Sequence, residues 1–414
     1  MDTMKVLYFH QHFSTPRGTI GNRSYQMAKR LLAHGHEVTM VCGSYGGGVT
    51  GITQPFSKGM RRGVVDGIDV IEFDLAYSNA NGFWGRVFVF LRFVFKSVGL
   101  VFNEPFDLVF ATSTPLTAGI PGVLAKRFRR KPFVFEVRDL WPELPEAMGV
   151  IRNKGLLRLL RGLEKLIYHS ADYVIGLSPG IVDGIKRAGT PSKKVSFVPN
   201  GCDISIFKEV QQQYRPEGVS SHDLMVVYTG THGPANGLDA VLDVAAVLKK
   251  RANLAIKFVL VGDGKQKAAL QTRAKLEKLS SVIFLDPMPK AELACLMKAA
   301  DVGMQILANI PAFYYGTSPN KFFDYISCGL PVLNNYPGWL AELIHEAECG
   351  FVVAPDKPDL FADCLEYADK HRDELSCMGE NAFKLAHQKF DRNNLSKEWA
   401  TCLEQVFLQF GASD

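Results

Sequence analysis

Short apolar runs alternate with amphipathic segments along most of the chain. In the first half these runs are rich in Val, Ile and Phe without strict polar alternation, as expected of strands buried on both faces. Segments 24–34 and 156–169 between them have helical spacing. This βαβ order predicts a parallel, doubly wound sheet, with strands at 5–9, 37–42, 68–73, 107–111, 133–137, 173–177 and 195–198.

The second half repeats this order. We expect strands at 224–228, 256–261, 282–285, 302–306, 331–334 and 351–354, and helices at 239–250, 265–279, 290–300 and 359–371. Two Rossmann-like domains are therefore predicted at 1–205 and 206–390, joined by the polar segment 210–223. The tail 391–414 holds one more amphipathic helix, at 392–410, which we expect to cross back to the first domain.

Length and composition agree with two folded domains. A chain of 414 residues exceeds one ordinary core, and 47% hydrophobic with 21% charged residues is typical of globular proteins. The eight cysteines form no Cys-x-x-Cys pair and no zinc-like cluster, so we expect free thiols in a reducing compartment. The N-terminus leads straight into a strand-like run, so no secretory signal is expected.

The segment 316–332 carries the most specific chemistry. Pro319 and Asn320 lead into a helix-like stretch on which Lys321 and Asp324 lie one turn apart. A cation beside a helix start suits a phosphate, and a carboxylate one turn later can accept two hydroxyl groups, as from a ribose. The pattern predicts a nucleotide-sugar site.

Glycine-rich loops follow the first strand of each half, where ligands bind in doubly wound sheets. The loop 10–23 opens a helix and offers close backbone approach, with candidate donor contacts at Gly18, Thr19, Gly21 and Arg23. The loops 229–237 and 261–265 add candidates Gly230, His232, Asn236, Gly262 and Lys265. None of these loops has the spacing G-x-G-x-x-G, which disfavours dinucleotide binding, and no P-loop motif is present, which disfavours P-loop ATP hydrolysis. Taken alone, each loop also fits an ordinary β–α turn.

Charged residues gather at the end of the strand 133–137. Asp139 or Glu143 is a candidate for orienting an acceptor hydroxyl, and Arg138 for holding a phosphate. A salt-bridged loop without function is the alternative interpretation.

Three segments of the first half suggest a membrane surface. The stretch 83–103 is rich in Phe, Leu and Val but carries three cations, which favours an interfacial helix over a spanning one. The stretch 152–165 has a basic face, and 126–131 holds five cations in six residues. Together they fit anionic lipid or a lipid-pyrophosphate acceptor. The alternative for 83–103 is a helix that covers the sheet, and no nucleic-acid-binding motif accompanies the charge.

Over nearly its whole length the chain resembles the GT-B glycosyltransferases, within them the large retaining family 4. The markers are Gly35-His-Glu-Val38, Ser178-Pro179, Val198-Pro-Asn-Gly-Cys-Asp203, Gly262-Asp-Gly264, Ala300-Asp301 and the block from Lys321 to Val332. The resemblance implies two Rossmann-like doubly wound α/β domains facing across a cleft, the first for the acceptor and membrane and the second for the nucleotide sugar. The run 136–143 resembles transferases of N-acetylated deoxy sugars such as N-acetyl-fucosamine, which build O-antigen or capsule units on polyprenyl pyrophosphate.

Three features depart from the family pattern. The usual Glu-x7-Glu is replaced by Gly316 and Asp324, so the resemblance leaves the first glutamate's role to Ser318, Asn320 or the backbone. A common lysine is Asn236, so Lys321, Lys265 or Arg23 is expected to supply charge at the diphosphate. Arg138 stands where relatives often have histidine.

We expect sugar transfer with retention, from a nucleoside diphosphate donor of which a UDP-sugar is favoured, to a polyprenyl-pyrophosphate-linked saccharide at the cytoplasmic face of the inner membrane. No D-x-D motif occurs, so we expect no metal at the leaving group. We also expect no cofactor, because the nucleotide sugar is a substrate. Base recognition is expected near Met288, through backbone groups, and Lys321 is the expected catalytic cation together with Arg138, Asp139 and Glu143.

Three other classes remain open at this stage. One is a GT-B epimerase acting on UDP-N-acetylglucosamine, and another is a non-catalytic membrane-bound assembly protein. The assembly-protein alternative is supported by two replacements, of the family's glutamate by Gly316 and of its lysine by Asn236. The third, a nicotinamide oxidoreductase, is disfavoured because the loop after the first strand, 10–23, lacks G-x-G-x-x-G.

Overall fold

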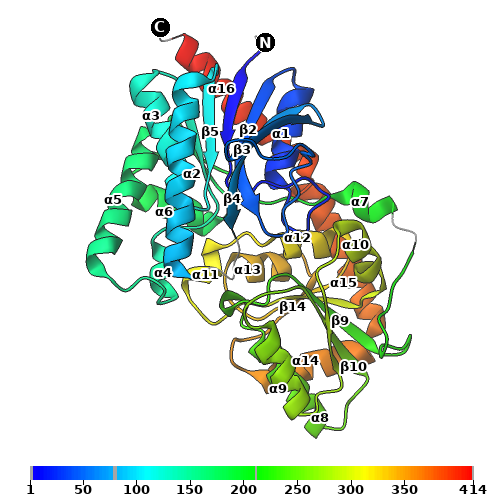
Figure 1. Ribbon diagram of the computed structural model, residues 1–414. Helices are drawn as coiled ribbons and strands as arrows, with labels where there is room; N and C mark the ends of the chain where they lie inside the picture. Colours follow the sequence, from blue (N-terminus) through cyan, green and yellow to red (C-terminus); the bar gives the residue numbers. More distant parts are fainter. Residues whose placement is uncertain (1–2, 78–81, 210–211, 413–414) are drawn as a thin grey trace. The chain divides into compact units, whose positions relative to one another are not determined.

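Two parallel sheets form the cores of two compact units (Figure 1). The computed structural model describes residues 3–77, 82–209 and 212–412. The first unit comprises Met1–Pro199, Gly316–Ser318 and Asn393–Asp414, and the second comprises Asn200–Tyr315 and Pro319–Arg392. The first two residues of the predicted linker 210–223 lie outside the described residues.

The sheet of the first unit has eight strands in the order β3-β4-β2-β1-β5-β6-β7-β8. All neighbours are parallel except β3 and β4. The bounds are β1 (Lys5–Phe9), β2 (Glu37–Tyr45), β3 (Met60–Val65), β4 (Ile68–Tyr77), β5 (Leu108–Thr112), β6 (Phe133–Val137), β7 (Tyr173–Gly176) and β8 (Val195–Phe197). The order reverses at β1, so its carboxyl end is the place where a doubly wound sheet binds ligands.

Helices flank this sheet, and α2, α3 and α5 lie side by side over one part of it (Figure 1). They are α1 (Arg23–Ala33), α2 (Phe83–Asn103), α3 (Ile120–Phe128), α4 (Glu143–Ala147), α5 (Lys154–Ser170) and α6 (Pro179–Arg187), with short 3₁₀ turns at Leu116–Gly119 and Ser192–Lys194. The last helix, α16 (Arg392–Gly411), packs Trp399 against Tyr8 and Phe110, with ring centroids 6.1 and 4.8 Å apart.

The sheet of the second unit has six parallel strands in the order β11-β10-β9-β12-β13-β14. They are β9 (Leu224–Thr229), β10 (Ile256–Val261), β11 (Val282–Leu285), β12 (Val302–Gln305), β13 (Val332–Asn334) and β14 (Gly350–Val352). Here the order reverses at β9, which places the loop 230–237 at the corresponding position.

The helices of the second unit complete its α/β layers. They are α7 (Ile204–Glu209), α8 (Asp239–Lys250), α9 (Lys267–Leu276), α10 (Lys290–Ala299), α11 (Ala312–Gly316), α12 (Asn320–Ser327), α13 (Trp339–Glu346), α14 (Pro358–Lys370) and α15 (Arg372–Lys389), with a 3₁₀ turn at Pro234–Asn236. Within the described residues, no helix is both long enough and apolar enough to cross a bilayer.

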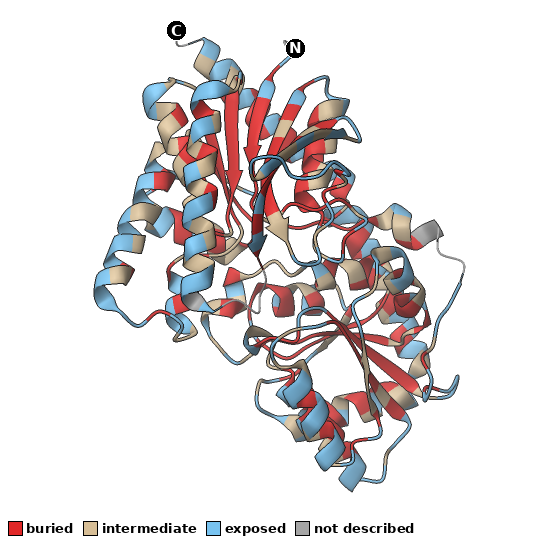
Figure 2. Cartoon of the chain, in the orientation of Figure 1, coloured by how far each residue is buried: buried red, intermediate tan, exposed pale blue. Residues whose placement is uncertain are grey.

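Continuous apolar runs occupy the centre of each sheet because helices cover both faces. Every residue of β6 and of β9 is buried, and Figure 2 shows the same for the central strands of both units. The two predicted Rossmann-like domains and all thirteen predicted strands are confirmed. The edge strand β3 was not predicted.

Candidate functional site

In the second unit the two glycine loops after β9 and β10 touch each other through their backbones. A Cβ on Gly262 would stand 1.9 Å from the carbonyl oxygen of Gly230, and one on Gly264 would stand 2.5 Å from that of His232. Both glycines also have φ near +150°, a backbone conformation that residues with a side chain rarely adopt. The loops therefore need glycine at these positions to form one continuous backbone surface at the end of the sheet.

We expect Gly262→Ala to lower the melting temperature and weaken nucleotide binding, because one of the two loops must move to admit the methyl group. The matched control is Gly233→Ala in the neighbouring loop, where the nearest atom to the new Cβ is a threonine methyl at 3.5 Å. Differential scanning fluorimetry of both variants checks this. Equal melting temperatures for the two variants would contradict the close loop contact.

Lys321 reaches this surface from the first turn of α12. Its Nζ donates to Asn236 Oδ1 at 3.0 Å and to the Tyr228 hydroxyl at 3.2 Å, and it lies 4.5 Å from the centroid of the Tyr228 ring. A Cβ on Gly230 would stand 3.2 Å from its Cε. The structure therefore brings together three residues that were predicted to bind the sugar donor, Lys321, Asn236 and Gly230.

The environment of Lys321 is poor in compensating charge. Burial lowers the pKa of Lys321 from 10.5 to about 7, and its two hydrogen-bond partners, an amide and a phenol, are neutral. A cation held this way gains when an anion arrives, because the anion supplies the missing partner. The site is suited to a phosphate or diphosphate, to which the start of α12 adds free N–H groups.

Asp324 lies one turn further along α12, as predicted, but it belongs to an ion-pair network. Its Oδ1 is 2.9 Å from Lys290 Nζ, and Lys290 also pairs with Asp203, which in turn pairs with Arg392. Burial raises the pKa of Asp203, and Arg392 and Lys290 more than offset this, so it falls to about 2. Asp324 is still partly exposed, which leaves one face open to a ligand hydroxyl.

The other residues of this unit that were predicted to bind the sugar donor differ in burial and in their neighbours. His232 is fully buried, and burial together with Lys267 lowers its pKa to about 4, so at neutral pH it carries no charge for a phosphate. Lys265 is exposed, whereas Lys267 holds the loop by donating to the Gly262 carbonyl at 2.8 Å. The remaining three are exposed Asn320 at the start of α12, half-buried Met288 before α10, and Ser318, which groups with the first unit.

In the first unit, Arg23 and Arg138 share a buried carboxylate. Arg23 is 2% exposed; it donates to Glu136 Oε2 at 2.9 and 3.1 Å and to the carbonyls of Val198 and Pro199. Arg138 donates to Glu136 Oε1 at 3.3 Å. The guanidinium of Arg23 is thus already occupied by protein groups, so we assign it a structural role in place of the predicted diphosphate contact.

The residues that were predicted to orient the sugar acceptor do not all lie together. Asp139 accepts a hydrogen bond from Thr114 at 3.0 Å, and burial raises its pKa, which favours a carboxylate able to take up a proton. Glu143 is instead exposed at the start of α4 and pairs with exposed Arg187. In the β1–α1 loop, Gly18 and Thr19 pack against the Gly47 carbonyl, while Gly21 is exposed.

A polar cluster at the carboxyl end of β1 escaped the sequence analysis. His10, Gln11 and His12 have buried ring or amide atoms without a hydrogen-bond partner. Burial lowers the pKa of His12 to about 3, with Arg138 adding to the effect. Its ring packs between Tyr45 and Tyr77, with centroids 4.7 and 4.6 Å away. The His-x-His spacing after the first strand was the available signal.

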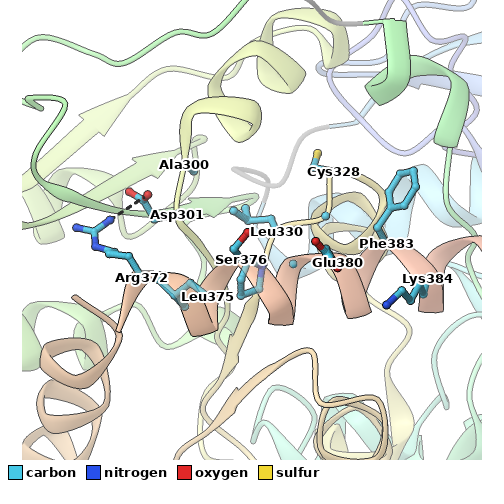
Figure 3. A pocket seen from close by; sticks show the side chains of 13 residues that line it. Ala300, Asp301, Cys328, Leu330, Arg372, Leu375, Ser376, Glu380, Phe383 and Lys384 are labelled. Carbon is cyan, nitrogen blue, oxygen red and sulfur yellow. Dashed lines mark ion pairs between the residues drawn. The ribbon is translucent and has the colours of Figure 1, made fainter. Parts of the chain in front are cut away.

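A cavity of about 650 Å³ in the second unit lies away from these groups (Figure 3). It is bordered by Asp301 and Arg372, whose ion pair spans 3.0 Å, and by Pro331. Asp301 and Pro331 precede β12 and β13, so the cavity is at the amino ends of the strands, opposite the glycine loops. Among the described residues, no group of three or more His, Cys, Asp or Glu is arranged to hold a metal ion.

Two known domain families match the chain in sequence. Residues 18–201 match the family described as glycosyl transferase 4-like domain, and residues 223–368 match glycosyl transferases group 1. The two matches together cover most of the chain.

Among curated proteins, the D-inositol 3-phosphate glycosyltransferase of Corynebacterium glutamicum is 24% identical over 209 residues, which is 47% of each chain. The D-rhamnosyltransferase WbpZ of Pseudomonas aeruginosa is 23% identical over 243 residues, or 58% of this chain and 61% of WbpZ. The matched region thus spans about half to three fifths of these relatives.

Solved structures share the fold over nearly the full length. The sucrose-phosphate synthase of Thermosynechococcus elongatus has a TM-score of 0.75 at 16% identity, covering 98% of this chain and 100% of the synthase. HepE of Anabaena in complex with UDP has a TM-score of 0.64 at 18% identity, covering 97% and 100%. At these identities the likeness shows the two-domain architecture.

Proposed function

The chain belongs to the GT-B glycosyltransferases, with a 4-like domain followed by a group 1 domain, and from this membership we propose that it transfers a sugar from a nucleoside diphosphate donor. The observation that carries the proposal is Lys321, a half-buried cation with neutral partners on the glycine-loop surface of the second unit. A diphosphate leaving group supplies the charge that this site lacks.

The proposed donor is a UDP-sugar carrying an N-acetylated hexosamine or deoxyhexosamine. Support for UDP is that HepE, which shares the fold, was solved in complex with UDP and with UDP-glucose. Support for the sugar class is the run 136–143, which resembles transferases of N-acetylated deoxy sugars.

The proposed acceptor is a polyprenyl-pyrophosphate-linked saccharide at the cytoplasmic face of the inner membrane, in surface-polysaccharide assembly. Support comes from WaaG, which has a TM-score of 0.68 at 17% identity and is described as involved in lipopolysaccharide biosynthesis. The basic and apolar helices of the first unit also suit a lipid-linked acceptor.

In the proposed reaction the bond between the sugar and the diphosphate breaks and a bond to an acceptor hydroxyl forms, with retention of configuration. Lys321, with the N–H groups at the start of α12, stabilises the charge that develops on the departing diphosphate. Asp324 accepts hydrogen bonds from hydroxyl groups of the nucleotide sugar, and the ion pair with Lys290 holds the carboxylate in place. Asp139 orients the acceptor hydroxyl, and its raised pKa suits transient proton uptake.

The test begins with a thermal-shift screen of UDP-, GDP- and dTDP-sugars on the full chain. The stabilising donor is then incubated with lipid-linked acceptor extracted from a membrane, and the anomeric configuration of the product is read by NMR. We expect stabilisation by UDP-sugars and a retained anomeric centre. Epimerisation or hydrolysis without acceptor would identify an epimerase instead, and the absence of any nucleotide binding would leave an assembly protein.

A further inference from the structure

We propose that α2 and α5 form a docking surface for an anionic bilayer, in which an apolar stripe on α2 enters the lipid interface and a basic stripe on α5 meets the headgroups. The inference rests on the proposed function in one respect, since a lipid-linked acceptor is the reason for such a surface. Its physical basis is the side-chain distribution of the first unit alone.

The outer face of α2 is apolar. Five large hydrophobic side chains follow one another at spacings of four, three, four and seven residues, which at about 100° per residue places them within an arc of roughly 60°. Trp84 is 77% and Phe95 is 84% exposed, and the others are exposed as well. The stripe consists of Trp84, Phe88, Leu91, Phe95 and Phe102.

The inner face of α2 is apolar too, and it covers the sheet. Phe93 and Val101 are buried in the core of the first unit, with the ring of Phe93 6.0 Å from that of Phe73. The helix therefore covers the core on one side, as the alternative interpretation of 83–103 predicted, and exposes an apolar stripe on the other. A helix covering a sheet normally has a polar outer face, and exposed apolar patches of this kind mark a binding surface.

The charges around the stripe are basic. The sequence of α2 has no acidic residue, and its exposed Arg92 lies over the ring of Phe88 at 5.6 Å from the centroid. Lys96 reaches inward and donates to the Gly59 carbonyl at 3.3 Å. Arg92 thus keeps its charge at the edge of the stripe, where an anionic headgroup would lie over inserted rings.

The α5 helix supplies a longer basic stripe. Four exposed cations recur at spacings of four, three and four residues, which places them on one face: Lys154, Arg158, Arg161 and Lys165. Of these, Arg161 pairs with Glu146. Exposed Leu159 and Leu166 flank the stripe.

The α3 helix joins the two stripes into one surface. It contacts both α2 and α5, and its exposed Phe128 lies 6.4 Å from Phe102 by ring centroids. Arg127 and Arg130, at and just after the end of α3, are exposed beside it. Figure 2 shows exposed positions along α2 and α5 on the same side of the first unit.

This charge pattern selects a lipid surface over a second copy of the chain. Two copies related by a two-fold axis would bring the basic stripes near one another, where like charges repel. An anionic bilayer offers opposite charge to α5 and α3 and an apolar interior to the rings of α2. Interfacial insertion also suits the amphipathic ring of Trp84 and the apolar rings of the phenylalanines.

The test uses Trp84 as a built-in reporter, because Trp339 and Trp399 are buried and Trp141 is half-buried against the core of the first unit. The full chain is titrated with vesicles of phosphatidylcholine alone or mixed with phosphatidylglycerol, and tryptophan emission and co-sedimentation are measured. We expect a blue shift and sedimentation with the anionic vesicles, both reduced at high salt. Phe95→Ser and the pair Arg158→Glu/Lys165→Glu should each weaken binding by about tenfold or more.

Matched controls come from the second unit. Leu276→Ser removes an equally exposed apolar side chain, and Lys250→Glu reverses an exposed cation; neither should change vesicle binding. Equal binding by all variants, or no blue shift, would overturn the inference. So would a concentration-dependent dimer in sedimentation velocity that Phe95→Ser abolishes. Thermal shift with UDP-sugars on the same samples separates failure of docking from failure of the proposed function.

Discussion

Lys321→Met is expected to reduce sugar transfer by roughly 10²–10³-fold, the range seen when a transition-state donor is removed. The side chain places a cation at the glycine-loop surface, where it donates to Asn236 and Tyr228. Methionine keeps most of its apolar stem, so the packing against the Tyr228 ring is retained while the charge is lost. The initial rate of product formation at saturating donor measures the effect.

The same substitution should stabilise the free protein, and the effect has a defined pH dependence. Folding lowers the pKa of Lys321 from 10.5 to about 7 because the ammonium is desolvated. Between these values the unfolded chain binds more protons than the folded one, so stability from this group rises with pH. The melting temperature of Lys321→Met should therefore exceed that of the wild type most below pH 7, and the gap should close towards pH 10.5.

Lys250→Met is the control, since Lys250 is an exposed lysine at the end of α8 and should leave both transfer and melting temperature unchanged. Donor binding by calorimetry adds a further check, because Lys321 should take up a proton when the diphosphate binds, so the apparent enthalpy should depend on the buffer. Full activity of Lys321→Met, in a folded sample with the stabilising donor, would contradict the proposed role of Lys321 at the diphosphate.

Local patterns predicted the elements well but not the partners of the site residues. The strand β3 was missed although Asp66-Gly67 is a hairpin signal; both residues have positive φ, as a two-residue turn requires. Its sequence, with two arginines and alternating burial, is that of a polar edge strand, which periodicity tuned to buried strands does not detect.

The site residues show why the remainder stayed hidden. Lys321 and Asp324 were placed correctly because helical spacing and the Pro319-Asn320 start are local signals. Asn236, the partner of Lys321, lies 85 positions away in the chain, and Lys290, the partner of Asp324, lies 34 positions away. Only the fold brings these pairs together. Arg23 shows the reverse case, since its loop position suggested a ligand contact and its neighbour Glu136 came from 113 positions away.

Arg23→Met is expected to lower the free energy of unfolding of the first unit by about 3–5 kcal/mol, the cost of leaving a buried charge without its partner. Glu136 is fully buried, and burial raises its pKa; Arg23 and Arg138 more than offset this, so the pKa is lowered. Without Arg23 the carboxylate keeps Arg138 and Thr112, while the carbonyls of Val198 and Pro199 lose a donor. A drop on the order of 10 °C in melting temperature follows.

Calorimetric unfolding and nucleotide titration together distinguish the two roles considered for Arg23. A structural Arg23 lowers the melting temperature and leaves the dissociation constant for the donor unchanged, because the proposed diphosphate site at Lys321 belongs to the second unit. A diphosphate contact would do the opposite. The double variant Arg23→Met/Glu136→Leu should recover much of the lost stability, since removing both charges also removes the desolvation penalty. Arg17→Met, at an exposed arginine in the same loop, is the matched control and should melt like the wild type.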